Sequence, residues 1–111
     1  MSYVGYNSVA TRNFIRIELY INSGDKDNNK AIFDSLYSKK DAVETEFGQP
    51  LVWERLDEKV TARVKYELSN VSIFNEEDWD KMIEFMVKYV PKFEAAFKKP
   101  IQEISKKYLS R

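Results

Sequence analysis

The chain of 111 residues contains no cysteine and no histidine. Without cysteine there can be no disulfide, thiol nucleophile or cysteine-ligated metal, and this composition suits a reducing cytoplasm, where we expect the protein. Without histidine the chain lacks the most common general base and the most common transition-metal ligand, so a serine triad would have no base. The three glycines stand apart at Gly5, Gly24 and Gly48, so there is no glycine-rich phosphate loop either. We therefore predict no catalytic residue, no metal ligand and no cofactor.

The chain also lacks a long apolar segment and an excess of charge of either sign. No apolar run approaches the roughly 20 residues of a membrane-spanning helix, so we expect no contact with a membrane. The 18 basic and 18 acidic residues cancel, which argues against binding nucleic acid by bulk charge but leaves room for a local basic face. With 43% hydrophobic and 32% charged residues, the composition is typical of a soluble globular domain. The length permits one hydrophobic core, so we predict a single domain over residues 1–111.

What the chain does contain is a regular alternation of apolar and charged residues. Between Val60 and Leu68 every second residue is apolar, and this pattern predicts a strand with one buried face and one charged face. Residues 51–56 predict its hairpin partner, with a polar turn at residues 57–59. Residues 14–21 alternate in the same way, and residues 2–10 predict a short first strand.

Two amphipathic segments predict helices. The first covers residues 30–47 and should end at Gly48. The second begins after Asn75, whose side chain can cap it. Pro91 removes a backbone donor, so we expect this helix to kink or split there, and Pro100 is compatible with the start of a short third helix. The apolar stripe of the second helix consists of Trp79, Met82, Ile83, Met86, Val90, Phe93 and Phe97.

The order strand, strand, helix, strand, strand, helix predicts an α+β fold. We expect a four-stranded, mainly antiparallel sheet with both helices packed on its apolar face. The opposite face is left to water or to a partner. The core should contain Ile15, Ile17, Leu19, Phe33, Leu36, Val64, Tyr66, Met86 and Phe93.

Several stretches of the chain resemble a known family. They are the RIELYI strand at residues 16–21, the WERL run at residues 53–56, and Arg63 in the next strand. With the loop and helix between them, they resemble an uncharacterised prokaryotic family of domains of unknown function, DUF4268, over about residues 4–97. The resemblance implies a domain that usually ends a longer, nuclease-like or defence-associated protein, and it implies no reaction. Related members often have serine before this arginine; Ala62 stands here, so no hydroxyl role carries over.

The charged face of the predicted sheet is the candidate site. Glu67 should project from this face, and Glu54 or Arg55 should join it according to the parity of their strand. Trp53 either shares the face with Arg55 and stacks on a ligand, or belongs to the core. We also expect the three arginines of this region to lie within reach of one another. The candidate binding residues are Arg16, Glu18, Trp53, Arg55, Arg63 and Lys65.

Charged strands of this kind often make only cross-strand ion pairs on a solvated face, each contributing little. The alternative is a recognition surface on which arginines grip phosphates and aromatics stack on bases. We therefore predict a non-catalytic binding or accessory domain of a prokaryotic nucleic-acid-processing or defence system, with nucleic acid or another protein domain as partner. The competing hypothesis is a nuclease-like enzyme with a carboxylate-only metal site, although Glu58 and Lys59 lack the nuclease spacing. Three carboxylates meeting in one pocket would favour it; the oligomeric state stays open.

Overall fold

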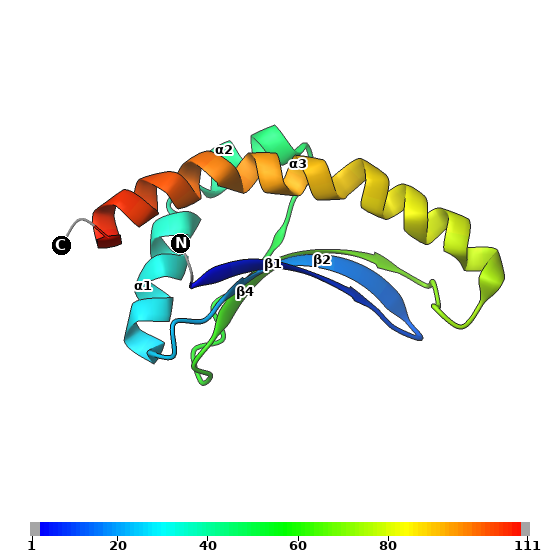
Figure 1. The fold of residues 1–111 in the computed structure, drawn as a ribbon, viewed down its shortest axis with the longest axis horizontal. Helices are drawn as coiled ribbons and strands as arrows, with labels where there is room; N and C mark the ends of the chain where they lie inside the picture. The colour runs from blue at the N-terminus through cyan, green and yellow to red at the C-terminus, as the bar shows by residue number, and fades with distance from the viewer. Residues whose placement is uncertain (1–2, 110–111) are drawn as a thin grey trace.

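The computed structural model describes residues 3–109 and has an α+β fold (Figure 1). The predicted fold class and all four strands are confirmed, but there are three helices, because the predicted helix over residues 30–47 is divided. Residue Ser2, where the first strand was predicted to begin, lies outside the described residues. The elements are β1 (Val4–Ala10), β2 (Phe14–Ile21), α1 (Lys26–Tyr37), α2 (Lys40–Phe47), β3 (Val52–Glu54), β4 (Ala62–Ser69) and α3 (Glu76–Leu109).

The strands form one sheet in the order β1-β2-β4-β3, and every neighbouring pair is antiparallel. In the central pair Ile17 lies opposite Tyr66 and Leu19 opposite Val64, which puts the apolar residues of both strands on one face. Strand β3 is shorter than predicted, because the chain leaves the ladder after Glu54 and Leu56 takes a left-handed φ of 55°.

The helical segment after β2 is broken at Ser38 and Lys39. Helix α1 starts at its N-cap Asp25, whose side chain accepts a hydrogen bond from the backbone N–H of Asn28. It ends where the Lys39 N–H donates to the Leu36 carbonyl at 2.9 Å, a tightened last turn that closes the helix. Helix α2 then ends at Gly48 as predicted, with a φ of 92° that favours glycine.

Helix α3 runs through 34 residues without interruption, so a split at Pro91 and a new helix at Pro100 are both excluded, whereas a kink at Pro91 stays a prediction. Figure 1 shows α3 arched over the sheet, with the convex side outward. Pro91 removes the helical N–H donor to the Val87 carbonyl, and both residues lie at exposed positions of the helix. Among residues 3–109 no helix combines the length and the apolar character that crossing a membrane requires.

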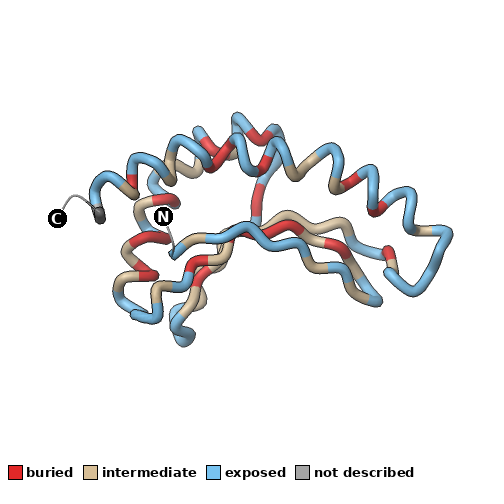
Figure 2. Tube along the Cα trace, viewed as in Figure 1, coloured by how far each residue is buried: buried red, intermediate tan, exposed pale blue. Residues whose placement is uncertain are grey.

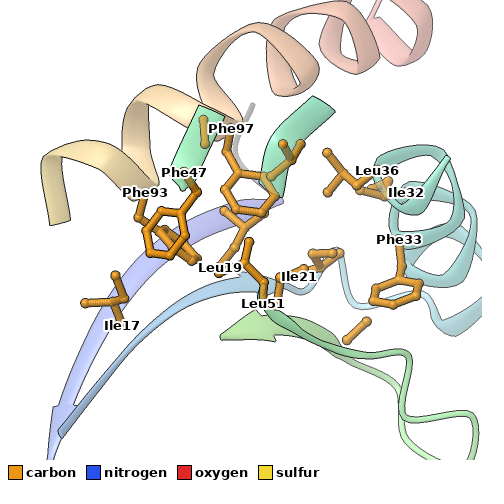
Figure 3. Packing of buried hydrophobic residues seen from close by; sticks show 14 of the residues in the cluster. Ile17, Leu19, Ile21, Ile32, Phe33, Leu36, Phe47, Leu51, Phe93 and Phe97 are labelled. Atoms are coloured by element: carbon orange, nitrogen blue, oxygen red, sulfur yellow. The ribbon is translucent and has the colours of Figure 1, made fainter. Parts of the chain in front are cut away.

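The core lies between the helices and one face of the sheet (Figures 2 and 3). Most of the predicted core residues are buried, and Tyr66 and Met86 are partly buried. The predicted stripe of α3 was partly wrong, because Trp79 is 46% and Ile83 is 59% exposed. The buried face of α3 is instead carried by Met82, Phe85, Phe93, Ala96, Phe97 and Ile104.

Candidate functional site

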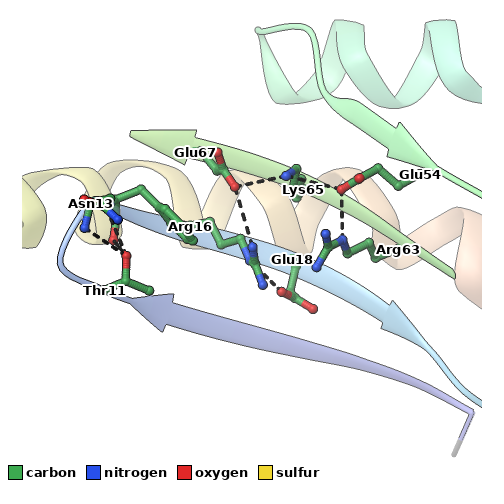
Figure 4. Close-up of polar contacts among 9 residues, drawn as sticks. Thr11, Asn13, Arg16, Glu18, Glu54, Arg63, Lys65 and Glu67 are labelled. Carbon is green, nitrogen blue, oxygen red and sulfur yellow. Dashed lines mark hydrogen bonds and ion pairs between the residues drawn. The ribbon is translucent and has the colours of Figure 1, made fainter. Parts of the chain in front are cut away.

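The sheet face opposite the core carries a chain of alternating charges, which we call the polar-face network. The antiparallel register builds it, since Arg16 lies opposite Glu67 and Arg63 lies opposite Glu54, all pointing away from the apolar face. Side chains two residues apart on one strand extend it. The polar-face network consists of Arg16, Glu18, Glu54, Arg63, Lys65 and Glu67 (Figure 4).

Each member of the polar-face network contacts a group of opposite charge. Arg16 Nε lies 2.8 Å from Glu18 Oε1, and Arg16 Nη1 lies 3.6 Å from Glu67 Oε1. Lys65 Nζ bridges Glu67 and Glu54, at 3.1 and 3.3 Å. Arg63 Nε completes the row at 2.9 Å from Glu54 Oε1. The row therefore holds three cations and three carboxylates and has no net charge.

The polar-face network is only partly open to solvent. Its side chains are between 5% and 26% exposed, with Glu18 the most covered. Burial alone would raise the pKa of Glu54, but hydrogen bonds from Arg63 and Lys65, together with their charges, lower it below its ordinary value. Arg63 and Lys65 thus favour the ionised form of the Glu54 carboxylate.

Four of the predicted binding residues, Arg16, Glu18, Arg63 and Lys65, lie in the polar-face network, and Arg55 does not. Arg55 lies beyond the end of β3 and turns toward α1. Its Nε and Nη2 donate to the two carboxylate oxygens of Asp34 at 2.9 and 3.1 Å, and its Nη1 donates to Asp57. These hydrogen bonds raise the pKa of the Arg55 guanidinium above its ordinary value. The expected group of three arginines is therefore reduced to Arg16 and Arg63 on the polar face.

Trp53 lies on the apolar face, which decides between the two alternatives left open for it. Its ring packs against Phe33, Tyr37 and Phe97, with centroids 6.2, 5.5 and 6.0 Å away. Its indole N–H donates to Glu44 Oε2 at 3.1 Å, so its one polar atom is satisfied. Trp53 is therefore a packing residue that ties β3 to α1, α2 and α3.

A second cluster of polar contacts, which sequence reasoning missed, lies under the loop between β3 and β4. The Lys30 Nζ is buried and donates to the carbonyl oxygens of Arg55, Leu56 and Thr61 at 2.5, 2.7 and 2.6 Å. Burial lowers the pKa of Lys30. The fully buried Asn29 adds a bond from Nδ2 to the Val60 carbonyl at 2.7 Å. A lysine in an amphipathic helix normally faces water, so nothing in the sequence distinguishes Lys30 from the other lysines.

No arrangement suited to metal chemistry is found among residues 3–109, where no three acidic side chains are placed to hold an ion. The carboxylate-metal alternative therefore receives no support from the geometry. An open hollow of about 500 Å³ lies between β1 and α3. Tyr6 lines it, and burial together with the charge of Glu94 raises the pKa of this tyrosine to about 12.

Comparisons with known proteins point to a family and to no activity. Searches against curated proteins and against solved structures found no match. The family model described as "Domain of unknown function (DUF4268)" matches residues 1–101, which is most of the chain. The chain therefore belongs to the DUF4268 family of domains of unknown function.

Proposed function

We propose that this protein is a non-catalytic accessory domain that binds nucleic acid through the polar-face network. The observation that carries the proposal is the position of the network on the sheet face that no helix covers within residues 3–109, since the buried core joins the helices to the opposite face (Figure 1). Arg16, Lys65 and Arg63 are held there by their carboxylate partners. Cations that are already ordered lose little side-chain entropy when they contact a phosphate.

Two aromatic residues on the same face support this choice of partner. Phe14 and Tyr20 alternate with the apolar positions of β2 and therefore point to the side of Arg16. The Arg16 guanidinium lies 5.2 Å from the centre of the Phe14 ring. Unpaired bases can stack on such rings and guanidinium planes with little dependence on sequence, which favours a single strand as the ligand.

The balance of charge sets the strength of the expected binding. Each of the three cations already pairs with a carboxylate. A phosphate must therefore displace a carboxylate before it can pair with a cation, and the neutral network offers no net positive charge to attract it. At most three phosphates are contacted, and the slope of log K against log salt should therefore not exceed about 3 in magnitude. We expect weak binding that is measurable at low salt.

The biological setting is part of the proposal. The resemblance noted above implies a domain at the C-terminal end of a longer prokaryotic protein, often beside a nuclease-like domain, and we propose that setting for this chain. A weak, sequence-tolerant contact to a single strand would help such a neighbour stay on its substrate by raising its effective concentration there. We propose the cytoplasm as its location.

The test is a titration of labelled single- and double-stranded DNA and RNA at two salt concentrations. Arg63→Ala should weaken binding and lower the salt slope by about one unit, because one phosphate contact is lost. In the wild type the Glu67 carboxylate pairs with both Arg16 and Lys65. Glu67→Gln should therefore strengthen binding, because it removes the negative charge that competes with a phosphate for these two cations. Lys59→Ala removes a positive charge from the β3–β4 loop and serves as the matched control, with binding close to that of the wild type.

The two variants with opposite expected effects separate recognition from simple ion pairing. If the network only stabilises the sheet, both Arg63→Ala and Glu67→Gln lower stability by no more than about 1 kcal/mol, and neither changes binding. Absence of binding by the wild type at low salt would show that the nucleic-acid proposal is wrong.

A further inference from the structure

Strand β1 is an open edge of the sheet that lacks the usual protection. It comes first in the strand order, and within residues 3–109 no strand pairs with its outer side. Its seven residues, VGYNSVA, include no charge and no proline. Natural edge strands usually carry such residues because an open row of backbone groups pairs with other chains. An uncharged edge of this length is suited to pairing with a further strand.

Two backbone hydrogen bonds tell which groups of β1 point outward. The Tyr3 carbonyl accepts from the Asn22 N–H, and the Thr11 N–H donates to the Phe14 carbonyl, each at 2.8 Å. In an antiparallel pair the backbone groups of alternate residues point to the partner. The odd-numbered residues of β1 therefore bond to β2, and the outward N–H and C=O groups belong to Val4, Tyr6, Ser8 and Ala10.

We propose that two copies of this chain join through β1, antiparallel and centred on Asn7, to form one eight-stranded sheet. This register uses all four outward residues, and it places Tyr6 opposite Ser8 of the partner subunit and Val4 opposite Ala10 of the partner subunit. On the other face Gly5 lies opposite Val9 of the partner subunit. Every such pair combines a large residue with a small one, and no like charges meet, because β1 has no charge.

The surroundings of β1 favour a second copy as the occupant. The hollow beside β1 is lined by Val4 and Tyr6 of the strand and by Pro91, Glu94, Ala95, Lys98, Ile101 and Gln102 of α3. Val87 precedes Pro91 by one helical turn and is 72% exposed, so the apolar part of this flank extends along the edge. The flank also carries one acidic and one basic residue, Glu94 and Lys98, so the lining has no net charge. A two-fold axis through Asn7 brings the same flank of the second α3 to the same side of the joined sheet, as in an isologous interface, and adds no net charge there.

Cysteine cross-linking tests the register directly, because the natural chain has no cysteine. Asn7 faces Asn7 of the partner subunit in a pair without backbone hydrogen bonds, where Cα atoms lie about 4.5 Å apart, a separation that a disulfide can span. Asn7→Cys should therefore form a covalent dimer on mild oxidation. A mixture of Gly5→Cys and Val9→Cys should cross-link, whereas each of these variants alone should do so far less.

Measurement of the molar mass in solution, by light scattering over a range of concentrations, tests the dimer without a cross-link. The wild type should approach the mass of two chains as concentration rises. Ser8→Pro removes an outward N–H and no bond to β2, so it should keep the fold, checked by circular dichroism, and stay monomeric. Asn7→Lys is a second variant that faces its own Glu18 in the monomer but places two lysines together on the axis. A wild type that stays monomeric at the highest soluble concentration, or dimers that survive both substitutions, would overturn the proposal.

Discussion

At the scale of single residues, Lys30 and Asn29 of α1 anchor the loop between β3 and β4 through hydrogen bonds. Together they donate to four backbone carbonyls of residues 55–61, which have no strand partner there. This anchorage explains how Leu56 keeps a left-handed φ of 55°, a conformation that costs a non-glycine residue free energy. The turn at Leu56 in turn sends Arg55 toward Asp34 and away from the polar-face network.

Replacing Lys30 with methionine tests this role. The side chain keeps its volume, but three carbonyl oxygens lose the ammonium donor, and the Leu56 carbonyl keeps a second donor in the Lys59 N–H. The free energy of unfolding should therefore fall by about 2–4 kcal/mol. Lys26→Met, at an exposed position of the same helix, should change it by less than about 0.5 kcal/mol. Urea denaturation measures both. A loss at Lys30 no larger than that at Lys26 would mean that water replaces the ammonium group at these carbonyls.

Alternation predicted the direction of a residue only where the residue pairs in the sheet. Arg16, Glu18, Arg63 and Lys65 point to the polar face as expected, because β2 and β4 are paired over eight residues. Arg55 and Trp53 have the same parity, yet only Trp53 lies within β3, so only Trp53 has a direction that the strand determines. The sequence carries no mark of the end of β3, since the loop depends on donors from a helix 25–31 residues earlier.

At the scale of elements, the break between α1 and α2 lets two short helices, instead of one long helix, bury the apolar residues of this segment. Phe33 and Leu36 before the break and Val43 and Phe47 after it are all buried, so the spacing that predicted one helix did predict the buried residues. Neither glycine nor proline marks Ser38 and Lys39, so the stop could not be predicted from these usual signals. Contacts with another element contribute instead, since Lys39 forms an ion pair with Glu103 of α3.

Helix α3 shows the opposite outcome, because it contains two prolines and remains continuous. Pro91 lies at an exposed position, and its aromatic neighbours along the helix pack in the core on both sides of it. Tertiary packing of Tyr89 and Phe93 thus outweighs the local cost of proline.

Restoring the missing donor with Pro91→Ala should therefore stabilise the protein, by about 1–3 kcal/mol as judged by denaturant unfolding. Pro100→Ala provides a comparison within the same helix. A decrease in stability for Pro91→Ala would mean that the arch of α3 over the sheet depends on proline, because a straighter helix would lose contacts at one of its ends.

At the scale of the whole molecule, one sheet separates two layers of different chemistry. On one side aromatic rings dominate, and Phe47 contacts Tyr66, Tyr89 and Phe93 with centroids 5.0–5.8 Å apart. On the other side the strands are joined by the neutral polar-face network, which links β2, β4 and β3. These aromatic contacts involve no carboxylate, whereas the ion pairs of the network need the carboxylate form, so acid should act mainly on the network.

The pH dependence of stability tests this division at Glu54, whose pKa is lowered in the folded protein. A lowered folded pKa means that the stabilisation is fully present above the unfolded value of 4.5 and is lost as the pH falls through the folded value. Glu54→Gln should cost about 1 kcal/mol at neutral pH, and this difference from the wild type should shrink as the pH falls from 4.5 through the folded pKa. Glu58→Gln removes a carboxylate outside the network, so its stability should follow the wild type throughout. Urea unfolding across this pH range measures all three proteins, and a constant difference for Glu54→Gln would show that its carboxylate charge contributes nothing and that the loss comes from packing alone.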